Sequence, residues 1–144
     1  RPMYRPLLVV ILAAVPNCPL VNVAGNYKLD LRTESASSWD LSDKERGCRK
    51  SGGTTIEIDS NGLMTGNNLT WPPGNSSILN NSGKLGGRVE PGAEPMQWVA
   101  SAGDVEMKGT WKRGQLSGEF VRRFIYDGKE IECRGKVSGF KRGK

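Results

Sequence analysis

The chain has 144 residues, of which 36% are hydrophobic, and a formal net charge of +6, which suits a single domain with one modest core. It contains no histidine, which excludes Ser-His-Asp and Cys-His catalytic sites, and it has no Gly-rich loop followed by Lys-Ser or Lys-Thr to cradle a phosphate. Its cysteines include no C-x-x-C pair that would indicate zinc. We therefore expect a protein that is not an enzyme and that uses no metal or cofactor.

Residues 1–24 are predicted to form a signal peptide or a membrane anchor. Two arginines precede a short apolar run from Leu7 to Val15, which is the order of regions in a secretory leader. The run is shorter than the roughly 20 apolar residues of a transmembrane helix. Cleavage after Ala24 is the leading expectation, and the alternatives are lipidation at Cys18 and retention of residues 7–21 as an anchor.

Alternation of apolar and polar residues predicts several strands in the first two thirds of the chain. Between them, Leu41 to Arg46 could hold one helical turn, and Asn61-Gly62 predicts a type I′ hairpin turn. The expected strands are Gly25 to Arg32, Thr54 to Asp59, Leu63 to Gly66 and Met96 to Ala100.

Residues 67–95 are rich in Asn, Gly, Pro and Ser, which predicts a long loop within a single domain of residues 25–144. Brief apolar interruptions favour one or two short strands in it, at Asn68 to Trp71 and at Gly86 to Glu90. The part around Pro72 to Ser82 is expected to be mobile.

Residues 104–140 predict a three-stranded antiparallel meander, because apolar side chains take every second position and turns at Arg113-Gly114 and Asp127-Gly128 separate the runs. With the earlier strands, this predicts an all-β fold of about seven or eight strands, a small antiparallel meander that closes into a barrel. Closure is favoured because it removes exposed edges, and a β-sandwich is the alternative. The inward positions are Val105, Met107, Trp111, Leu116, Phe120, Phe124, Tyr126, Ile131, Cys133 and Val137.

Two short segments resemble known families. Gly25-Asn26-Tyr27 is similar to the Gly-x-aromatic sequence that opens the first strand of calycin barrels. Residues 109–114, Gly-Thr-Trp-Lys-Arg-Gly, resemble a membrane-occupation (MORN) repeat. Each resemblance covers only the residues quoted, and neither implies a functional residue in this chain.

Cys48 and Cys133 are predicted to form a disulfide. Removal or modification of Cys18 would leave them as an even pair in an oxidising compartment. The bond would tie a polar, turn-rich stretch to the last strand. The alternative is a pair of free thiols, buried at Cys133 and exposed at Cys48.

Arg122 shares the inward parity of Phe120 and Phe124. The arrangement we expect is a β-bulge at Arg122-Arg123 that turns both side chains into water. If Arg122 instead points inward, its guanidinium needs a carboxylate or a ligand anion, and Asp30 or Glu57 would be the partner. Solvent-facing positions predict ordinary solvated carboxylates at Asp104, Glu106, Asp127, Glu130 and Glu132.

The basic composition, with a sequence pI near 9.4, indicates attraction to anionic partners. The leading hypothesis is an exported, non-catalytic module, periplasmic or extracellular, that binds a partner protein or an envelope component. Nucleic acid is not expected, because aromatic residues are not interleaved with the basic ones. The predicted contact surface comprises the Trp71 loop, Arg123 and the basic tail, which consists of Arg134, Lys136, Lys141, Arg142 and Lys144.

Two other functions stay open. A lipocalin-like carrier would hold a small anionic ligand inside the barrel near Trp98, Trp111 and Arg122, and would need an interior cavity of several hundred Å³. A membrane-anchored accessory subunit of a larger complex would retain residues 7–21 as a helix.

Overall fold

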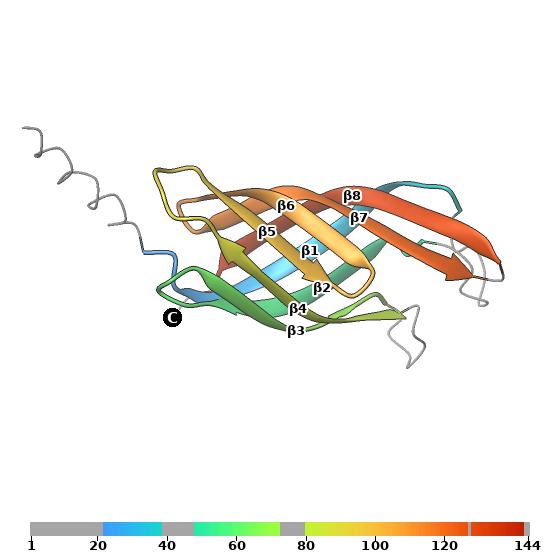
Figure 1. Cartoon of the computed structure of the whole chain (residues 1–144), viewed down its shortest axis with the longest axis horizontal. Helices are drawn as coiled ribbons and strands as arrows, with labels where there is room; N and C mark the ends of the chain where they lie inside the picture. Colours follow the sequence, from blue (N-terminus) through green and yellow to red (C-terminus); the bar gives the residue numbers. More distant parts are fainter. Residues whose placement is uncertain (1–21, 39–47, 73–79, 127, 143–144) are drawn as a thin grey trace, which may run out of the picture.

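The computed structural model describes residues 22–38, 48–72, 80–126 and 128–142. These residues form an all-β, eight-stranded antiparallel barrel in which each strand pairs with the next along the chain (Figure 1). Strand β1 also pairs with β8, so the sheet closes and has no open edge along its length. The predicted barrel is confirmed, and the sandwich alternative is wrong. The strands are β1 Gly25–Ala36, β2 Ser51–Ile58, β3 Leu63–Thr70, β4 Asn81–Val89, β5 Met96–Ala102, β6 Val105–Lys112, β7 Gln115–Tyr126 and β8 Lys129–Lys141.

The interior of the barrel is filled by alternate side chains of the strands. On β1, Tyr27 and Leu29 are fully buried while their polar neighbours face water. An eight-stranded barrel has an interior just wide enough for side chains to fill, and large ones occupy it here. The bulkiest fully buried side chains are Trp71, Trp98, Arg122, Tyr27 and Phe120.

Two predicted turns have different outcomes. Arg113 and Gly114 both take positive φ, 52° and 80°, as a type I′ turn requires. Gly62 has a φ of 89°, but Asn61 is not in the positive region, so the type I′ prediction at Asn61-Gly62 is wrong. The Asp59 carboxylate explains the difference, because its Oδ1 accepts from the backbone N–H groups of Asn61 and Leu63 at 2.8 and 2.9 Å.

The region 67–95 is not one long loop, because the second half of β3 and the whole of β4 lie within it. Strands β3 and β4 pair from Leu63 opposite Arg88 to Thr70 opposite Asn81. Most polar residues of the region on these strands face outward, whereas Ser82 is buried. One of its glycines meets a packing requirement: a Cβ on Gly87 would lie 2.2 Å from the Val99 carbonyl oxygen. Composition alone suggested a loop, whereas pairing with neighbouring strands makes it sheet.

Strand β7 runs past Arg122 without interruption. Its register with β8 is regular from Gln115 opposite Phe140 to Tyr126 opposite Lys129. The β-bulge expected at Arg122-Arg123 is therefore wrong, and Arg122 points into the barrel, where it is 1% exposed.

The core extends upstream of Gly25, where the domain was predicted to begin. Val23 is 8% exposed and belongs to the hydrophobic core. The start of β1 and the end of β8 lie at the same end of the barrel (Figure 1).

Several predictions fall outside the described residues. They are the leader or anchor at 1–21 with Cys18, the helical turn at 41–46, the loop residues 73–79 and Asp127 of the last hairpin turn. Within the part of the chain that the structure covers, we find no helix with the length and apolar character to cross a membrane.

Candidate functional site

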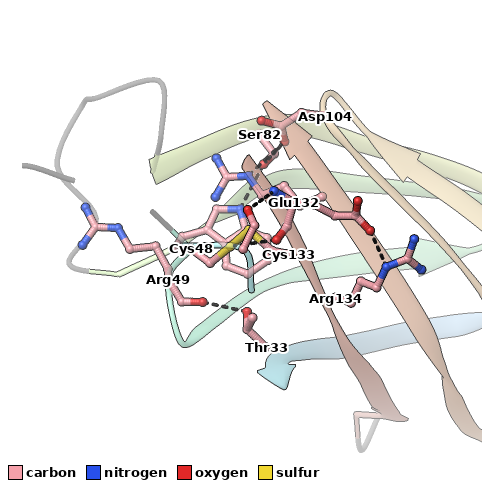
Figure 2. Close-up of a disulfide and its surroundings, with 11 residues drawn as sticks. Thr33, Cys48, Arg49, Ser82, Asp104, Glu132, Cys133 and Arg134 are labelled. Carbon is pink, nitrogen blue, oxygen red and sulfur yellow. Dashed lines mark hydrogen bonds and ion pairs between the residues drawn. A yellow bond between two sulfur atoms is a disulfide. The ribbon is translucent and has the colours of Figure 1, made fainter. Parts of the chain in front are cut away.

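Cys48 and Cys133 form the predicted disulfide, with their Cα atoms 5.7 Å apart. The bond joins the segment after β1 to β8 at one end of the barrel, which we call the disulfide end (Figure 2). Backbone contacts reinforce it, since Ser37 N donates to the Glu132 carbonyl and Glu132 N donates to Ser37 Oγ, both at 3.0 Å. A disulfide of this kind indicates a non-reducing, exported environment.

The carboxylate that neutralises Arg122 is Asp104. Arg122 Nε donates to Asp104 Oδ1 at 3.2 Å, so the predicted partners, Asp30 and Glu57, are wrong. Asp104 lies in the turn between β5 and β6 and is 25% exposed. It is therefore not the ordinary solvated carboxylate that its parity predicted. The antiparallel pairing of β6 with β7 sets Val105 opposite Arg122, and this places the preceding residue, Asp104, at the end of β7.

Two aromatic rings lie close to the Arg122 guanidinium. Its Cζ is 4.9 Å from the ring centroid of Trp71 and 4.7 Å from that of Phe124, distances at which cation–π attraction operates. Burial lowers the pKa of Arg122 below its usual value, while the charge and the hydrogen bond of Asp104 act in the opposite direction. The cation is thus compensated by groups of the chain itself.

A hydrogen-bonded chain connects Trp71 to this ion pair. Trp71 Nε1 donates to Ser82 Oγ at 2.9 Å, and Ser82 Oγ donates to Asp104 Oδ1 at 2.8 Å. Figure 2 shows Ser82 and Asp104 beside the disulfide. Trp71 is 1% exposed, so its predicted place on a contact loop is wrong.

The opposite end of the barrel, which we call the tyrosine end, holds a neutral chain. Trp111 Nε1 donates to the Tyr27 hydroxyl at 2.8 Å, and that hydroxyl donates to the Val23 carbonyl at 2.7 Å. Burial raises the pKa of Tyr27, and the hydrogen bond from Trp111 partly opposes this. Trp98 Nε1 also has a partner, the Thr110 carbonyl at 3.0 Å.

A hollow of about 670 Å³ lies on the outer face of β4–β8. Its charged lining includes more cations than anions, with Glu106 and Glu119 as the acidic members. Val99, in the middle of the hollow, is 42% exposed. We call the cations of this surface the basic face, and they are Arg88, Lys108, Arg123 and Arg134 in the hollow and Lys136 beside it.

Surface ion pairs occupy most of the basic face. Glu132 contacts both Arg134 and Arg123, the latter at 3.8 Å, and Glu119 contacts Lys136 at 3.8 Å. Arg88 Nε donates to Glu90 Oε2 at 2.7 Å. Exposed pairs of this kind contribute little, about 0 to 1 kcal/mol each. Within the described residues, Lys108 forms no ion pair. The face can therefore exchange its internal pairs for an external anion.

The structure separates the predicted site residues into two groups. Trp71, Trp98, Trp111 and Arg122 lie inside the barrel, whereas the remaining basic residues lie outside. The basic tail is also divided, because Arg134 and Lys136 belong to the middle of β8 while Lys141 and Arg142 lie at the tyrosine end.

Sequence reasoning missed Ser82 and the structural role of Asp104. Ser82 comes from β4, which is not a neighbour of β7, so no local pattern identifies it. Asp104 directly precedes Val105, which lies opposite Arg122, so the register of the predicted β6–β7 hairpin would have placed it beside Arg122. Arg88 and Lys108 were also missed, although their alternation with apolar neighbours on β4 and β6 would have placed them outward.

In the described part of the chain, no three His, Cys, Asp or Glu side chains come together as metal ligands would. The chain matches no protein-family model, and no curated protein is significantly similar to it. Any function of this chain must therefore be inferred from the geometry of the barrel and from the charge on its surface.

Proposed function

We propose that the chain is an exported, non-catalytic binding module that holds an anionic partner, a protein or an envelope component, on its basic face. The observation that carries the proposal is the contrast between a filled interior and a hollowed, cationic exterior. Arg122 inside the barrel already has a carboxylate at 3.2 Å, whereas the hollow over β4–β8 presents cations to solvent.

The interior offers little support for the carrier alternative. Trp98 and Trp111, which were expected to line a ligand site, are 0% and 3% exposed, and their indole N–H groups bond to the chain itself. A ligand would have to displace packed aromatic rings, which fill the interior near protein-core density. The outer hollows need no such rearrangement.

The basic face suits an extended, acidic surface. Arg88, Lys108 and Lys136 lie on one row across the strands, with Val99 and Glu119 between them. Neighbouring strands are about 4.8 Å apart, so successive cations of the row are separated by roughly 10 Å. Long, flexible cationic side chains at such spacing can follow a row of carboxylates or phosphates, and the attraction is expected to weaken as salt screens it.

The disulfide and the predicted leader both favour a periplasmic or extracellular location. A buried Cys48–Cys133 bond is typical of proteins that fold outside the reducing cytosol. Anionic envelope polymers and acidic exported proteins are the partners available there.

The test is site-specific photocrosslinking in the organism that makes the protein. A photoreactive phenylalanine at Val99 lies in the hollow, and one at Thr65, exposed on β3, samples a different outer face. We expect one discrete crosslinked species from Val99 and none from Thr65. Equal crosslinking from both positions would contradict a dedicated face.

Charge reversal then separates specific from incidental contact. In the Val99 crosslinking background, Arg123→Glu with Arg134→Glu should abolish the adduct, because both side chains line the hollow. The matched control is Lys141→Glu with Arg142→Glu, which changes the net charge equally at the tyrosine end. Loss of the adduct in both double variants would mean that only net charge matters.

A further inference from the structure

A second group of exposed basic residues surrounds an exposed aromatic ring at the tyrosine end. Phe140 is 50% exposed near the end of β8, and the basic residues beside it are also exposed. We call this group the terminal patch, and it consists of Lys112, Arg113, Phe140, Lys141 and Arg142.

Backbone pairing makes the terminal patch continuous. Gln115 lies opposite both Lys112 on β6 and Phe140 on β8. Lys141 N donates to the Gly114 carbonyl at 2.9 Å, which places the end of β8 against the β6–β7 turn. The patch is thus assembled from two places in the sequence and is invisible as a sequence motif.

The cations of the patch are available to an external anion. None of its basic side chains forms an ion pair with another described residue. Glu94 Oε2 accepts from the backbone N–H of Arg113 at 2.9 Å, so this carboxylate contacts the patch through the main chain. Lys28, opposite Phe140, is already paired with Asp30 at 3.1 Å.

We propose that the terminal patch binds the surface of an anionic lipid membrane. Basic side chains around an exposed aromatic ring are the combination that holds proteins at a headgroup layer. A second exposed apolar side chain, Leu63 at 53%, lies at the same end. The chain connectivity points the same way, since residues 1–21, with the apolar run Leu7 to Val15, join the barrel here through Val23.

This proposal does not depend on the function of the basic face, because it uses different side chains. It adds an orientation: with the tyrosine end against the headgroups, the disulfide end points away from the membrane. The basic face on the side of β4–β8 then stays open to a partner.

The experiment measures partition of the full chain onto vesicles of pure phosphatidylcholine and onto vesicles containing phosphatidylglycerol. Any binding through the apolar run contributes to both, so the ratio of the two partition constants isolates the electrostatic part. We expect a ratio well above one that falls as salt is raised. Each basic residue near an anionic surface contributes about a fivefold preference, so Lys141→Gln with Arg142→Gln should lower the ratio by about 25-fold.

The matched control is Lys84→Gln with Lys129→Gln, which removes the same charge from exposed residues at the disulfide end. This control should change the ratio by less than about threefold, because the disulfide end points away from the membrane in this orientation. An equal loss in both double variants, or a wild-type ratio near one, would overturn the proposal. Patch-dependent binding to soluble polyglutamate in place of the vesicles would also overturn it, in favour of an acidic polypeptide. Phe140→Ser should lower binding to the anionic vesicles severalfold at high salt, where the apolar contribution remains.

Discussion

Each end of the barrel holds a chain of two hydrogen bonds of the same type, and the two chains differ in their final acceptor. At each end an indole N–H donates to a side-chain hydroxyl, which donates to an oxygen: Trp71 to Ser82 to Asp104 at one end, and Trp111 to Tyr27 to Val23 at the other. The disulfide end finishes on a carboxylate, whereas the tyrosine end finishes on a backbone carbonyl.

That difference decides what else each end requires. The Asp104 carboxylate is paired with the buried Arg122 cation. Desolvated charges are stable only when they are paired and hydrogen-bonded. The disulfide end therefore contains an ion pair, aromatic rings on the guanidinium and the Cys48–Cys133 bond. The tyrosine end needs no charge compensation, and its basic residues stay outside on the terminal patch.

The largest effect is expected from removal of the disulfide. Cys48→Ser with Cys133→Ser opens a loop of 85 residues in sequence separation, and chain-entropy arguments predict a loss of about 4 kcal/mol in the free energy of unfolding. Urea denaturation measures the loss, and Cys18→Ser is the control. Hydrogen exchange should accelerate at the amides of Ser37 and Glu132 before those of the tyrosine end. Uniform acceleration at both ends would remove the distinction between them.

The next effect concerns the ion pair. Asp104→Asn keeps the shape of the side chain but leaves the Arg122 charge without its carboxylate, which should cost about 3 kcal/mol in urea unfolding. Adding Arg122→Met should restore much of that loss, because an apolar side chain of similar length needs no counter-charge. If the double variant is no more stable than Asp104→Asn alone, charge compensation is not the role of Asp104.

A smaller effect is expected at the tyrosine end. Tyr27→Phe leaves the Trp111 N–H and the Val23 carbonyl without their buried partner, which should cost about 2 kcal/mol. Tyr126→Phe is the matched control, since Tyr126 is half-buried on β7 and its hydroxyl forms no hydrogen bond with another described residue. The control should stay within about 0.5 kcal/mol of the wild type.

The smallest effect is a dependence on alkaline pH. Burial raises the pKa of Tyr27 in the folded state, so the associated stability is complete below the unfolded pKa of about 10 and is lost as pH rises through the folded value. Unfolding free energies measured from pH 8 upward should fall more steeply in the wild type than in Tyr27→Phe. A Cys18→Ser background prevents thiol exchange with the disulfide at high pH. Parallel pH profiles in the two proteins would contradict a buried, neutral Tyr27.

Much of the barrel was predictable because its information is local. Alternation on β1 and β5–β8 identified the inward residues, and Arg113-Gly114 identified its turn, since side-chain parity and φ preference are properties of short segments. The disulfide followed from parity at Cys133 and from the even pair that remains when Cys18 is assigned to the predicted leader. At residues 67–95 the two short strands expected at Asn68 to Trp71 and Gly86 to Glu90 are present as parts of β3 and β4. The long loop inferred from composition is wrong, because β3 and β4 extend further into this region and accommodate its Asn and Gly residues.

By itself, the sequence determined that the chain is all-β, which face of most strands is apolar, and which two cysteines form the disulfide. Tertiary structure alone decided that Arg122 faces inward, that Asp104 neutralises it, and that Lys112 and Lys141 share one patch. The physical reason is that the attraction between charges depends on their distance in space and not on their separation along the chain. The register of the consecutive strands β6, β7 and β8 is what brings these residues within that distance.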